Sequence, residues 1–451
     1  MKSAKSSKLP PGPKSKVPFG NVFGFRKDSL QFLRNIANEY GDIVHFRMGP
    51  LRVVLLNHPD PIKEILTSRH SNFVKGRPLE MAKELLGEGL LSSEGLFHKK
   101  QSRIIQPAFH MRMMELYVPA MVEYSERIMN SWRDGQEINI LPEMIRMSTG
   151  IAGKTMFNVD IEKDAPEIND ALEDIMGLFG RITMPFSEYL LKLPFPSTKK
   201  FYKARERLDE TIYKIIEDRK CNMLDNGDLL SLLLKAQLED DSSSRLNDRQ
   251  IRDEALTLLL TAFDTTSLAI TWTWYLLSQH PDIYNKLVGE LDRILDGRYP
   301  TLEDYSDLKY TKMVFEESLR IYPPIYIIAR ESINEFKIGD YIIPKRTIVL
   351  VSPYLIHHDS RFHRNPEKFD PTSLADRIEK SNSKYEYFPF SVGPRSCIGQ
   401  HYAMLEGVFV LASIAQRWKM ECLPGQKIEL EQLLNLRPKN GIRMRLKKRG
   451  I

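Results

Sequence analysis

A run of twenty residues, from Leu258 to Leu277, contains a single charged side chain, Asp264. A helix of this length and polarity can either cross a bilayer or lie in the core of a large protein. The run also carries five threonines, and nothing else in the chain resembles a second span. Because 451 residues can bury a large core, we expect a buried central helix rather than a membrane span.

Composition narrows the class of protein further. Lysine and arginine number 65 against 59 acidic residues, which gives a net charge of +6. Five of the lysines fall in the first sixteen residues, which contain no acid, so the rest of the chain is close to neutral. A concentrated basic face is not evident, and we therefore expect no nucleic acid partner. We interpret residues 1–20 as a basic, proline-rich segment that is flexible.

The cysteines indicate the cellular compartment. The sequence has three, Cys221, Cys397 and Cys422. An odd and sparse set argues against a disulfide framework and fits a reducing environment. The N-terminus contains no apolar stretch of signal-peptide or anchor length. We therefore expect a cytoplasmic protein with no membrane anchor.

Two short strand pairs are predicted within a largely helical chain. Residues 43–48 and 51–57 flank a Gly-Pro pair, and residues 336–338 and 341–343 flank a Gly-Asp pair. Internal repeats and clean domain boundaries are not evident. We therefore expect one mainly α domain with small β-sheets, spanning residues 21–451.

Apolar periodicity predicts that helices make up most of the remainder. The central helix has a clear start, because Asn247 and Gln250 have the spacing of a capping box, and Pro281 follows its end. The predicted helices are 28–40, 60–67, 97–106, 118–132, 165–180, 203–223, 227–237, 248–279, 281–295, 310–321 and 400–416.

The strongest local signal is a glycine-flanked turn that contains Cys397 and opens an amphipathic helix over 401–418. A helix N-terminus stabilises a thiolate. Gly393 and Gly399 allow the backbone to turn tightly and to approach a flat ligand closely. A lone thiolate that is not paired with a histidine is well suited to bind iron. The alternative interpretation is an inert, buried cysteine.

The pattern Phe390-x-x-Gly393-x-Arg395-x-Cys397-x-Gly399 resembles the haem-ligand signature of the cytochrome P450 superfamily. Other landmarks of this family occur in the expected order, so the resemblance covers essentially the whole chain. It implies the cytochrome P450 fold, with haem b held between the long central helix and the helix after the cysteine. It also implies that Cys397 is the proximal iron ligand, with Phe390 and Gly399 as further haem contacts.

Further landmarks are weak alone and gain meaning from the resemblance. Glu317 and Arg320 share a helix face, and in the family this pair is a buried lock behind the haem. Arg330 falls where relatives place a haem-propionate partner. His98 takes the position where Trp or His usually stands. The resemblance thus implies that Arg395, Arg330 and His98 hold the propionates.

The central helix contains Thr261-Ala262-Phe263-Asp264-Thr265-Thr266. A carboxyl group is costly within an apolar helix unless it has a partner or a function. The threonines alone can be explained by hydroxyls that bond to carbonyls one turn earlier, but this does not explain Asp264. The segment is similar to the family's oxygen-activation motif, which implies that Asp264 and Thr265 deliver protons during oxygen activation.

Three departures from the family pattern stand out. Thr261-Ala262 replaces the family's Ala-Gly before the acid, which changes the expected oxygen groove. Ser102 stands where an arginine is expected. Ser373 replaces the third member of the lock, and Arg377 is a candidate substitute.

We therefore expect a soluble, bacterial-type haem-thiolate monooxygenase that hydroxylates or epoxidises a lipophilic substrate. About fifty residues follow Cys397, too few for a fused reductase, so a separate ferredoxin or flavodoxin with its reductase is expected to supply electrons. Lys99, Lys100 and Arg103 are candidates for its docking face. The alternatives are a peroxide-driven haem oxidant and a non-catalytic haem-binding sensor.

The expected substrate pocket is apolar. Its lining is predicted to come from residues 73–91, 175–195 and 325–328, with Arg77, Arg181 and Tyr326 as polar exceptions. An apolar pocket with few polar anchors suits a lipophilic compound such as a fatty acid or terpenoid.

Overall fold

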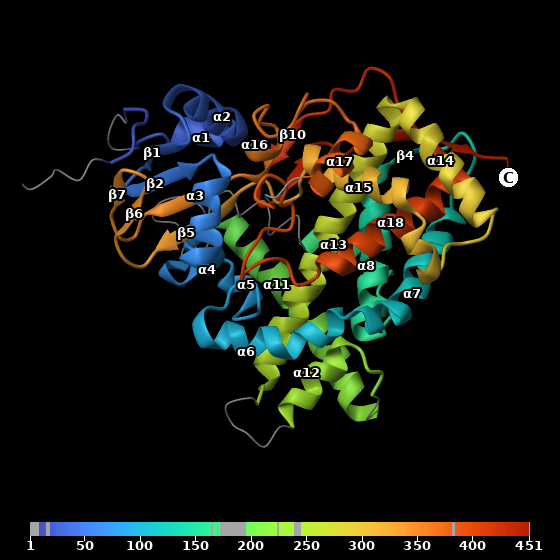
Figure 1. The fold of residues 1–451 in the computed structure, drawn as a ribbon. Helices are drawn as coiled ribbons and strands as arrows, with labels where there is room; N and C mark the ends of the chain where they lie inside the picture. The colour runs from blue at the N-terminus through green and yellow to red at the C-terminus, as the bar shows by residue number, and fades with distance from the viewer. Residues whose placement is uncertain are drawn as a thin grey trace, which may run out of the picture.

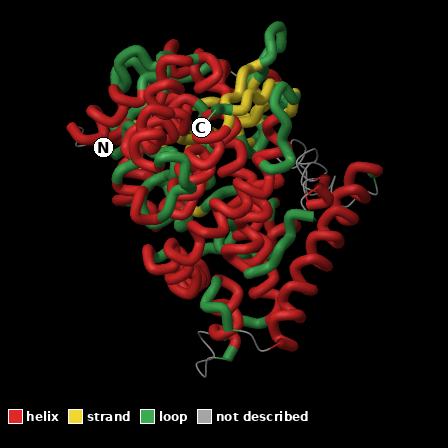
Figure 2. Tube along the Cα trace, turned by 90° about the vertical axis from the view of Figure 1, so that its right-hand side faces the viewer, coloured by secondary structure: helices red, strands yellow, loops and turns green. Residues whose placement is uncertain are grey.

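A five-stranded sheet at one side of the molecule borders a much larger helical part (Figure 1). The computed structural model describes residues 9–14, 19–163, 166–168, 170–171, 195–222, 225–238, 245–380 and 384–450. In a second view, helices make up most of the chain and strands form small patches (Figure 2). The predicted helix at 165–180 lies outside the described residues apart from 166–168 and 170–171, and the predicted pocket segment 175–195 lies outside them apart from Phe195.

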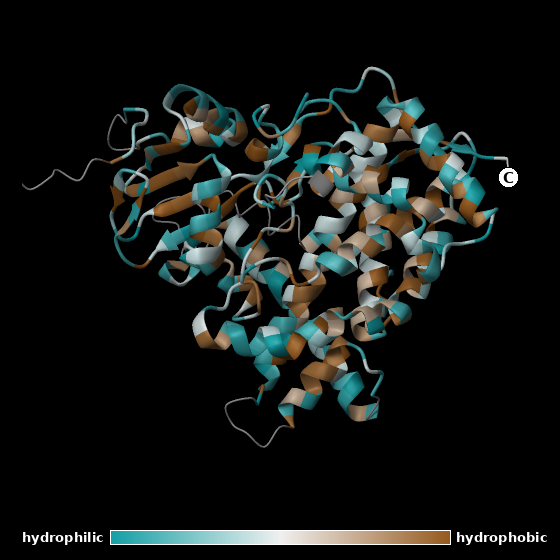
Figure 3. Cartoon of the chain, viewed as in Figure 1, coloured by the Kyte–Doolittle hydropathy of each residue, from teal (hydrophilic) through white to brown (hydrophobic). Residues whose placement is uncertain are grey.

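The strand order of this sheet is β1 (Ile43–Met48), β2 (Leu51–Leu56), β8 (Ile348–Val351), β5 (Ile328–Ser332) and β3 (Phe73–Val74). The first two strands form the predicted hairpin, and their neighbours come from much later in the chain. The strands are largely apolar (Figure 3). Arg330 lies on β5, so the sheet fixes the position of one predicted haem contact.

The second predicted strand pair is also present, as β6 (Phe336–Ile338) and β7 (Tyr341–Ile343). Near the C-terminus, β4 (Glu137–Asn139), β12 (Arg443–Lys448) and β9 (Trp418–Cys422) form a three-stranded sheet that the sequence did not indicate. A hairpin of β10 (Leu430–Gln432) and β11 (Leu436–Pro438) precedes β12. Each of these strands is only three to six residues long, too short for a clear alternating pattern.

Most predicted helices are present with small shifts of their ends. The two larger shifts are seven residues each, because the helix predicted at 118–132 begins at Met111 and the helix predicted from 203 begins at Pro196. The described helices are α1 (Val22–Lys27), α2 (Ser29–Tyr40), α3 (Pro59–Lys63), α4 (Arg77–Met81), α5 (Lys83–Leu86), α6 (Gly95–Ile105), α7 (Met111–Met129), α8 (Ile140–Phe157), α11 (Pro196–Asn222), α12 (Leu229–Gln237), α13 (Asp248–Gln279), α14 (Pro281–Leu295), α15 (Lys309–Ile321), α16 (Pro353–His357), α17 (Pro371–Lys380) and α18 (Gln400–Arg417).

The apolar run forms the centre of α13, and most of it is buried inside the protein, as predicted. Among the described residues, α13 is the one helix that is long and apolar enough to cross a membrane. The predicted capping box is present, because Asn247 Oδ1 accepts from Gln250 N and Gln250 Oε1 accepts from Asn247 N. Burial on all sides explains why a helix this apolar is stable in a globular fold.

Helix α8, which packs against α13, was missed by the sequence analysis. Fourteen of its eighteen residues are buried, and its polar face is a narrow stripe of Glu143, Arg146 and Lys154, so its amphipathic period is weak. Gly150 and Gly153 also lower its intrinsic helix propensity. Tertiary contacts therefore decide its structure. The packing of α8 against Tyr124 requires glycine at position 150, since a Cβ there would lie 2.4 Å from the Tyr124 ring.

The N-terminal segment is more closely attached to the fold than we expected. Residues 1–8 and 15–18 lie outside the described residues. In the described part, His45 N on β1 donates to Pro11 O at 2.9 Å, and Pro10 is buried. Residues 9–14 thus satisfy an unpaired backbone group at the edge of the sheet, and the flexibility of the segment 1–20 as a whole stays a prediction.

The pair of Glu317 and Arg320 on α15 is buried and bidentate, with Nε–Oε2 and Nη2–Oε1 distances of 2.7 Å. Arg320 also donates to three backbone carbonyls, those of His357, Pro366 and Lys368. Glu317 accepts from Asp370 N at 3.0 Å. Backbone groups of residues 357–370 thus satisfy the pair without an arginine at position 373.

Candidate active site

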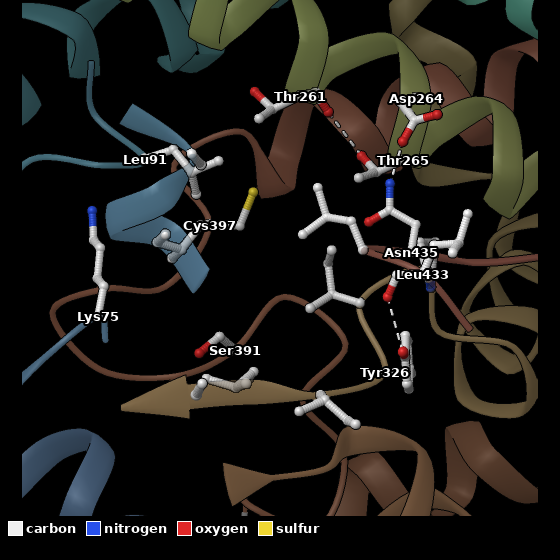
Figure 4. A pocket seen from close by; sticks show the side chains of 18 of the residues that line it. Lys75, Leu91, Thr261, Asp264, Thr265, Tyr326, Ser391, Cys397, Leu433 and Asn435 are labelled. Atoms are coloured by element: carbon white, nitrogen blue, oxygen red, sulfur yellow. Dashed lines mark hydrogen bonds between the residues drawn. The ribbon is translucent and has the colours of Figure 1, made fainter. Parts of the chain in front are cut away.

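A cavity of about 1000 Å³ lies between α13, the loop before α18, strand β5 and the β10–β11 hairpin (Figure 4). Its lining is mainly apolar and includes Leu258, Ala262, Ile325 and Leu433. The sequence-predicted site residues Asp264, Thr265, Cys397, Arg395, Arg330, His98, Phe390 and Gly399 all line this one cavity. Residues from four separate parts of the chain are thereby brought together.

The cysteine loop presents a single thiol to the cavity. Cys397 is exposed toward this interior space, and its backbone N donates to Phe390 O at 2.9 Å, which closes the loop. Burial raises the pKa of the Cys397 thiol, and the Gly399 backbone N–H acts in the opposite direction. A bound metal cation would deprotonate such a thiol outright. The chemistry of this donor, one soft sulfur before a helix, fits the proximal position of a haem.

Of the two glycines in the loop, only one has a backbone conformation that requires glycine. Gly393 has φ 83°, and a Cβ there would lie 2.2 Å from Leu66 O. Gly399 is the N-cap of α18 with φ −89°, and a Cβ there would make ordinary contacts with Phe109 and Cys397. The tight turn therefore depends on Gly393, and the close approach of a flat ligand at Gly399 stays a prediction.

The three predicted propionate partners gather at one end of the cavity. Arg395 pairs with Glu94 and donates to Ser93 O at 3.2 Å. Burial, together with the charge of Arg395, lowers the pKa of Arg330 to about 10. Burial lowers the pKa of His98 to about 3, with further contributions from Lys75 and Arg395. His98 is therefore a neutral hydrogen-bonding group at physiological pH.

Lys75 belongs to this group, and the sequence analysis missed it as a site residue. It follows β3 directly, is buried, and donates from Nζ to Leu90 O at 2.7 Å. Burial and the charges of Arg395 and Arg330 lower its pKa to about 7. No local motif marks it, because its role arises from the contact of β3 with β5 across the sheet.

The electrostatics of this end of the cavity fit a dianionic ligand. Lys75, Arg330 and Arg395 are three cationic groups close together, and Glu94 is the carboxylate paired with them. Burial raises the pKa of nearby Glu254 to about 8, so it offers little negative charge at neutral pH. Buried cations need counter-charges, and the two propionates of a haem ligated at Cys397 would supply them.

On α13, across the cavity from Cys397, lie Asp264 and Thr265 (Figure 4). The Thr265 hydroxyl donates to Thr261 O at 2.9 Å, which is the local bond that could explain a threonine within a helix. Thr261 bonds in the same way to Thr257 O at 2.8 Å. Helix α13 continues through Thr261-Ala262, so this altered pair does not end it.

The Asp264 carboxylate has two partners that the sequence analysis missed. Asn435 Nδ2 donates to its Oδ2, and Arg437 Nη2 donates to its Oδ1 at 2.9 Å. Burial raises the pKa of Asp264, while Arg437 and Asn435 oppose that shift. These partners lie more than 170 residues later in the chain. Only the tertiary fold brings them to the acid.

Two of the three predicted pocket-lining stretches contribute residues to the cavity, from Lys75 to Leu91 and from Ile325 to Ile328. Arg77 lines it, and Tyr326 lines it with its hydroxyl donating to Leu433 O at 2.9 Å. Arg181 lies outside the described residues.

Comparison with known proteins identifies the family. The cytochrome P450 family model matches residues 10–445, and the chain belongs to this family. It is 33% identical over 419 residues to cyclooctatin synthase of Streptomyces melanosporofaciens, covering 92% of this chain and 91% of the relative. It is 33% identical to cyclooctat-9-en-7-ol 5-monooxygenase of the same organism, covering 90% and 88%. It is 27% identical to pentalenene oxygenase of Streptomyces avermitilis, covering 95% and 94%.

Family membership confirms the predicted fold class, the monooxygenase class and the haem cofactor, which cytochromes P450 bind through a cysteine thiolate. The roles of the individual side chains in this chain stay predictions. The geometry supports them by placing all eight in one cavity.

We expect haem affinity to depend on pH through Lys75. Below pH 7, Lys75 is already protonated in the apoprotein. Above its pKa of about 7, Lys75 must take up a proton when haem binds, so that it can pair with a propionate. Affinity should therefore fall by up to about tenfold per pH unit above pH 7. Titration of apoprotein with haem, followed by fluorescence quenching from pH 6.5 to 9, measures this.

Two substitutions give matched controls for the haem titration. Lys75→Arg is charged throughout and should keep high affinity at all these pH values. Lys75→Met is neutral throughout and should show low affinity without this pH dependence. A wild-type affinity that is flat with pH contradicts the assignment of Lys75.

Proposed function

We propose that this enzyme inserts one oxygen atom from O2 into a lipophilic terpenoid, by hydroxylation or epoxidation, with electrons from a separate ferredoxin or flavodoxin and its reductase. The observation that carries this proposal is the apolar cavity with a lone thiol on one wall and an acid–hydroxyl pair on the facing wall. A carrier or sensor needs the thiol but has no use for the acid. The combination therefore favours turnover.

In this proposal the haem is held by Cys397 at the metal and by Arg395, Arg330, His98 and Lys75 at the propionates. When bound, the haem supplies the oxygen-activating redox chemistry, and the thiolate adds electron density that favours O–O cleavage. The apolar lining excludes water and orients the substrate over the reactive centre. Phe390 and Gly399 border the site from the cysteine loop.

The proton-handling roles fall to Asp264 and Thr265. In the structure the Thr265 proton is donated to Thr261 O. A rotation about χ1 moves this hydroxyl toward the cavity, where it can donate instead. Asp264 is a buried acid whose pKa burial raises toward the range useful for proton transfer at neutral pH. The two groups come from adjacent residues of one helix, which keeps both side chains attached beside the same part of the cavity.

The substrate class is inferred from the cavity and from the relatives. The Tyr326 hydroxyl is already bonded to Leu433 O, so the lining near it offers mainly apolar contact. Two relatives are named for acting on pentalenene and cyclooctat-9-en-7-ol. The first name denotes an alkene and the second an unsaturated alcohol, and neither denotes a carboxylic acid. These names favour a terpenoid over a fatty acid.

The electron donor is inferred from the surface of α6. Lys99 and Arg103 are exposed there, while Lys100 donates to Arg245 O at 2.9 Å. Exposed cations on the helix that carries His98 would attract an acidic protein partner by complementary charge. We also propose a cytoplasmic location, consistent with three unpaired cysteines and with the burial of α13.

Substitution of the acid–hydroxyl pair tests the proposed function. Asp264→Asn should lower oxygen-dependent product formation by about a hundredfold, a typical contribution of one general acid. Thr265→Ala should consume reductant at a near-normal rate but release peroxide or water in place of product. The measurement is product formed per reductant oxidised, with a surrogate ferredoxin and reductase and a panel of terpenes and terpene alcohols.

The same variants separate the two alternative functions. Peroxide already carries its protons, so peroxide-driven product formation should change little in either variant. A wild-type protein that turns over only with peroxide would support the peroxide-driven oxidant. One that binds the panel but forms no product with either oxidant would support a sensor.

A further inference from the structure

The hairpin of β10 and β11 connects the substrate cavity to the buried acid. Its turn contributes Leu433, Leu434 and Asn435 to the cavity lining. Two of its residues, Asn435 and Arg437, hold Asp264. Figure 4 shows Asn435 between the cavity and Asp264, with its amide nitrogen directed at the acid. One short element therefore contacts both the substrate space and the proposed proton donor.

The hairpin is anchored firmly on both sides of its turn. Leu436 N donates to Pro324 O at 2.8 Å, and its carbonyl accepts from Trp272 Nε1 on α13 at 3.0 Å. Before the turn, Gln432 Oε1 accepts from Ser29 Oγ at 2.7 Å and from Leu30 N at 3.1 Å. These bonds fix the strands, so the position of Arg437 relative to α13 is set by the fold.

Both oxygens of the Asp264 carboxylate are engaged by donors from this hairpin. Arg437 has 14% of its side chain exposed and Asp264 has 8%, so their ion pair is shielded from water. Among the described residues, Arg437 is the charged group whose field acts on Asp264. Without it the carboxylate would be a buried and unpaired charge, which a protein avoids by neutralising the group.

We propose that Arg437 and Asn435 are positioning residues for Asp264, and that the β10–β11 hairpin transmits ligand contact in the cavity to this acid. The proposal rests on the proposed role of Asp264 in proton delivery. Arg437 limits the rise in the pKa of Asp264 that burial causes, so that the acid can both take up and release a proton, and Asn435 fixes which way the carboxyl group faces. A ligand that contacts residues 433–435 moves the Asn435 side chain, which lines the cavity, and thereby changes the environment of the acid.

Removal of the cation should change the protonation state of Asp264. An opposite charge at this distance lowers a carboxyl pKa by about 1 to 3 units, so Arg437→Met should raise the pKa of Asp264 by a similar amount. The acid then holds its proton more tightly and is a weaker proton donor. The limb of the pH–turnover profile due to Asp264 should move to higher pH by about 1 to 3 units.

Infrared spectroscopy of the purified haem protein gives a readout that does not depend on activity. Arg437→Met should show a stronger protonated-carboxyl C=O band at pH 7 than the wild type, and this band should disappear when Asp264→Asn is added. Arg437→Lys keeps a cation and should resemble the wild type. Arg443→Met is the matched control, since Arg443 forms an exposed pair with Glu137 on the neighbouring sheet. It should leave the band and the pH profile unchanged.

Turnover and ligand binding complete the test. Oxygen-dependent turnover of Arg437→Met should fall by about tenfold or more at pH 7, with at least partial recovery in Arg437→Lys. Geranylgeraniol, used as a probe ligand, should perturb the Asp264 band in the wild type and should lose this effect in Asn435→Leu. If Arg437→Met does not accumulate as folded protein, Asn435→Leu replaces it in the band and pH measurements.

The possible failures are distinguishable. If Asp264→Asn keeps full oxygen-dependent turnover, the proposed proton role of the acid is wrong. If Asp264→Asn is crippled but Arg437→Met and Asn435→Leu keep the wild-type band and pH profile, the positioning proposal alone is overturned. If the band and pH profile move but the probe ligand perturbs neither the wild type nor the variants, transmission through the hairpin is overturned.

Discussion

Cys397→Ser should abolish the red-shifted Soret band of the reduced protein under carbon monoxide, together with all oxygen-dependent product formation. A serine hydroxyl keeps the shape of the loop but does not provide the soft anionic sulfur that gives a haem thiolate its spectrum. The loop itself should survive, because the bond from the residue 397 backbone to Phe390 O and the turn at Gly393 do not involve the thiol. The loss should therefore be specific to the metal ligand.

The other two cysteines are matched controls for this substitution. Cys221 is exposed on α11, and Cys422 lies on β9 beside Gln426. Neither lines the cavity. Cys221→Ser and Cys422→Ser should keep the shifted band at full intensity. A Cys397→Ser protein that retained the band, or a Cys422→Ser protein that lost it, would require another ligand and a different site.

Features of the fold with local causes could be predicted from the sequence. The glycine turn and amphipathic pattern around Cys397 indicated a helix opening at a thiol, and α18 begins three residues later at Gln400. The length and polarity of the run around Asp264 indicated a buried helix, which is α13. In both cases the residues that decide the structure are close together in the sequence.

The features that were missed depend on contacts between distant parts of the chain. Helix α8 is enclosed by its neighbours apart from a narrow polar stripe, so its amphipathic period is too weak to reveal it. Lys75 is defined as a site residue by its position beside Arg330 and Arg395, and Arg437 by its pairing with Asp264. Each of these residue types is common on solvated surfaces, and only burial beside a specific partner separates them from the rest.

The departures at Ser102 and Ser373 have different structural consequences. Ser102 lines the cavity, and Lys75 supplies a cation near the same end, so the positive charge expected there comes from another element. At Ser373 no charge is replaced. The groups that complete the Glu317–Arg320 lock are carbonyls and an N–H of the backbone. Arg377 lines a small hollow beside the lock, and its compensating role stays a prediction.

Arg320→Leu should lower the free energy of unfolding by about 3–5 kcal/mol, the typical cost of removing one partner of a buried ion pair. Glu317 is 2% exposed and would be left as a buried carboxylate without its cation. The carbonyls of His357, Pro366 and Lys368 would lose their donor as well. Urea unfolding of the haem protein, followed by circular dichroism, measures the change.

The lock also supports the cysteine loop, so its loss should weaken haem retention. Arg320 donates to His357 O at 2.8 Å, and His357 Nε2 accepts from Phe388 N at 3.0 Å, at the start of the segment that leads to Cys397. Burial holds the pKa of His357 well below its usual value, so the ring is neutral and can accept this bond. Haem transfer from Arg320→Leu to apomyoglobin should therefore be faster than from the wild type.

The same helix offers a control that separates a lock from an ordinary ion pair. Lys312 and Glu316 lie 3.9 Å apart on α15, with 44% of the lysine side chain exposed. Because an exposed pair is worth about 0–1 kcal/mol, Lys312→Met should change stability and haem transfer little.

Replacing both lock residues, Arg320→Met with Glu317→Met, should recover only part of the loss. Apolar residues remove the unpaired charge, but they leave the three carbonyls and Asp370 N without partners. Full recovery in this double variant would mean that the loss in Arg320→Leu comes from the unpaired charge of Glu317, and that the bonds to the 357–370 backbone add little.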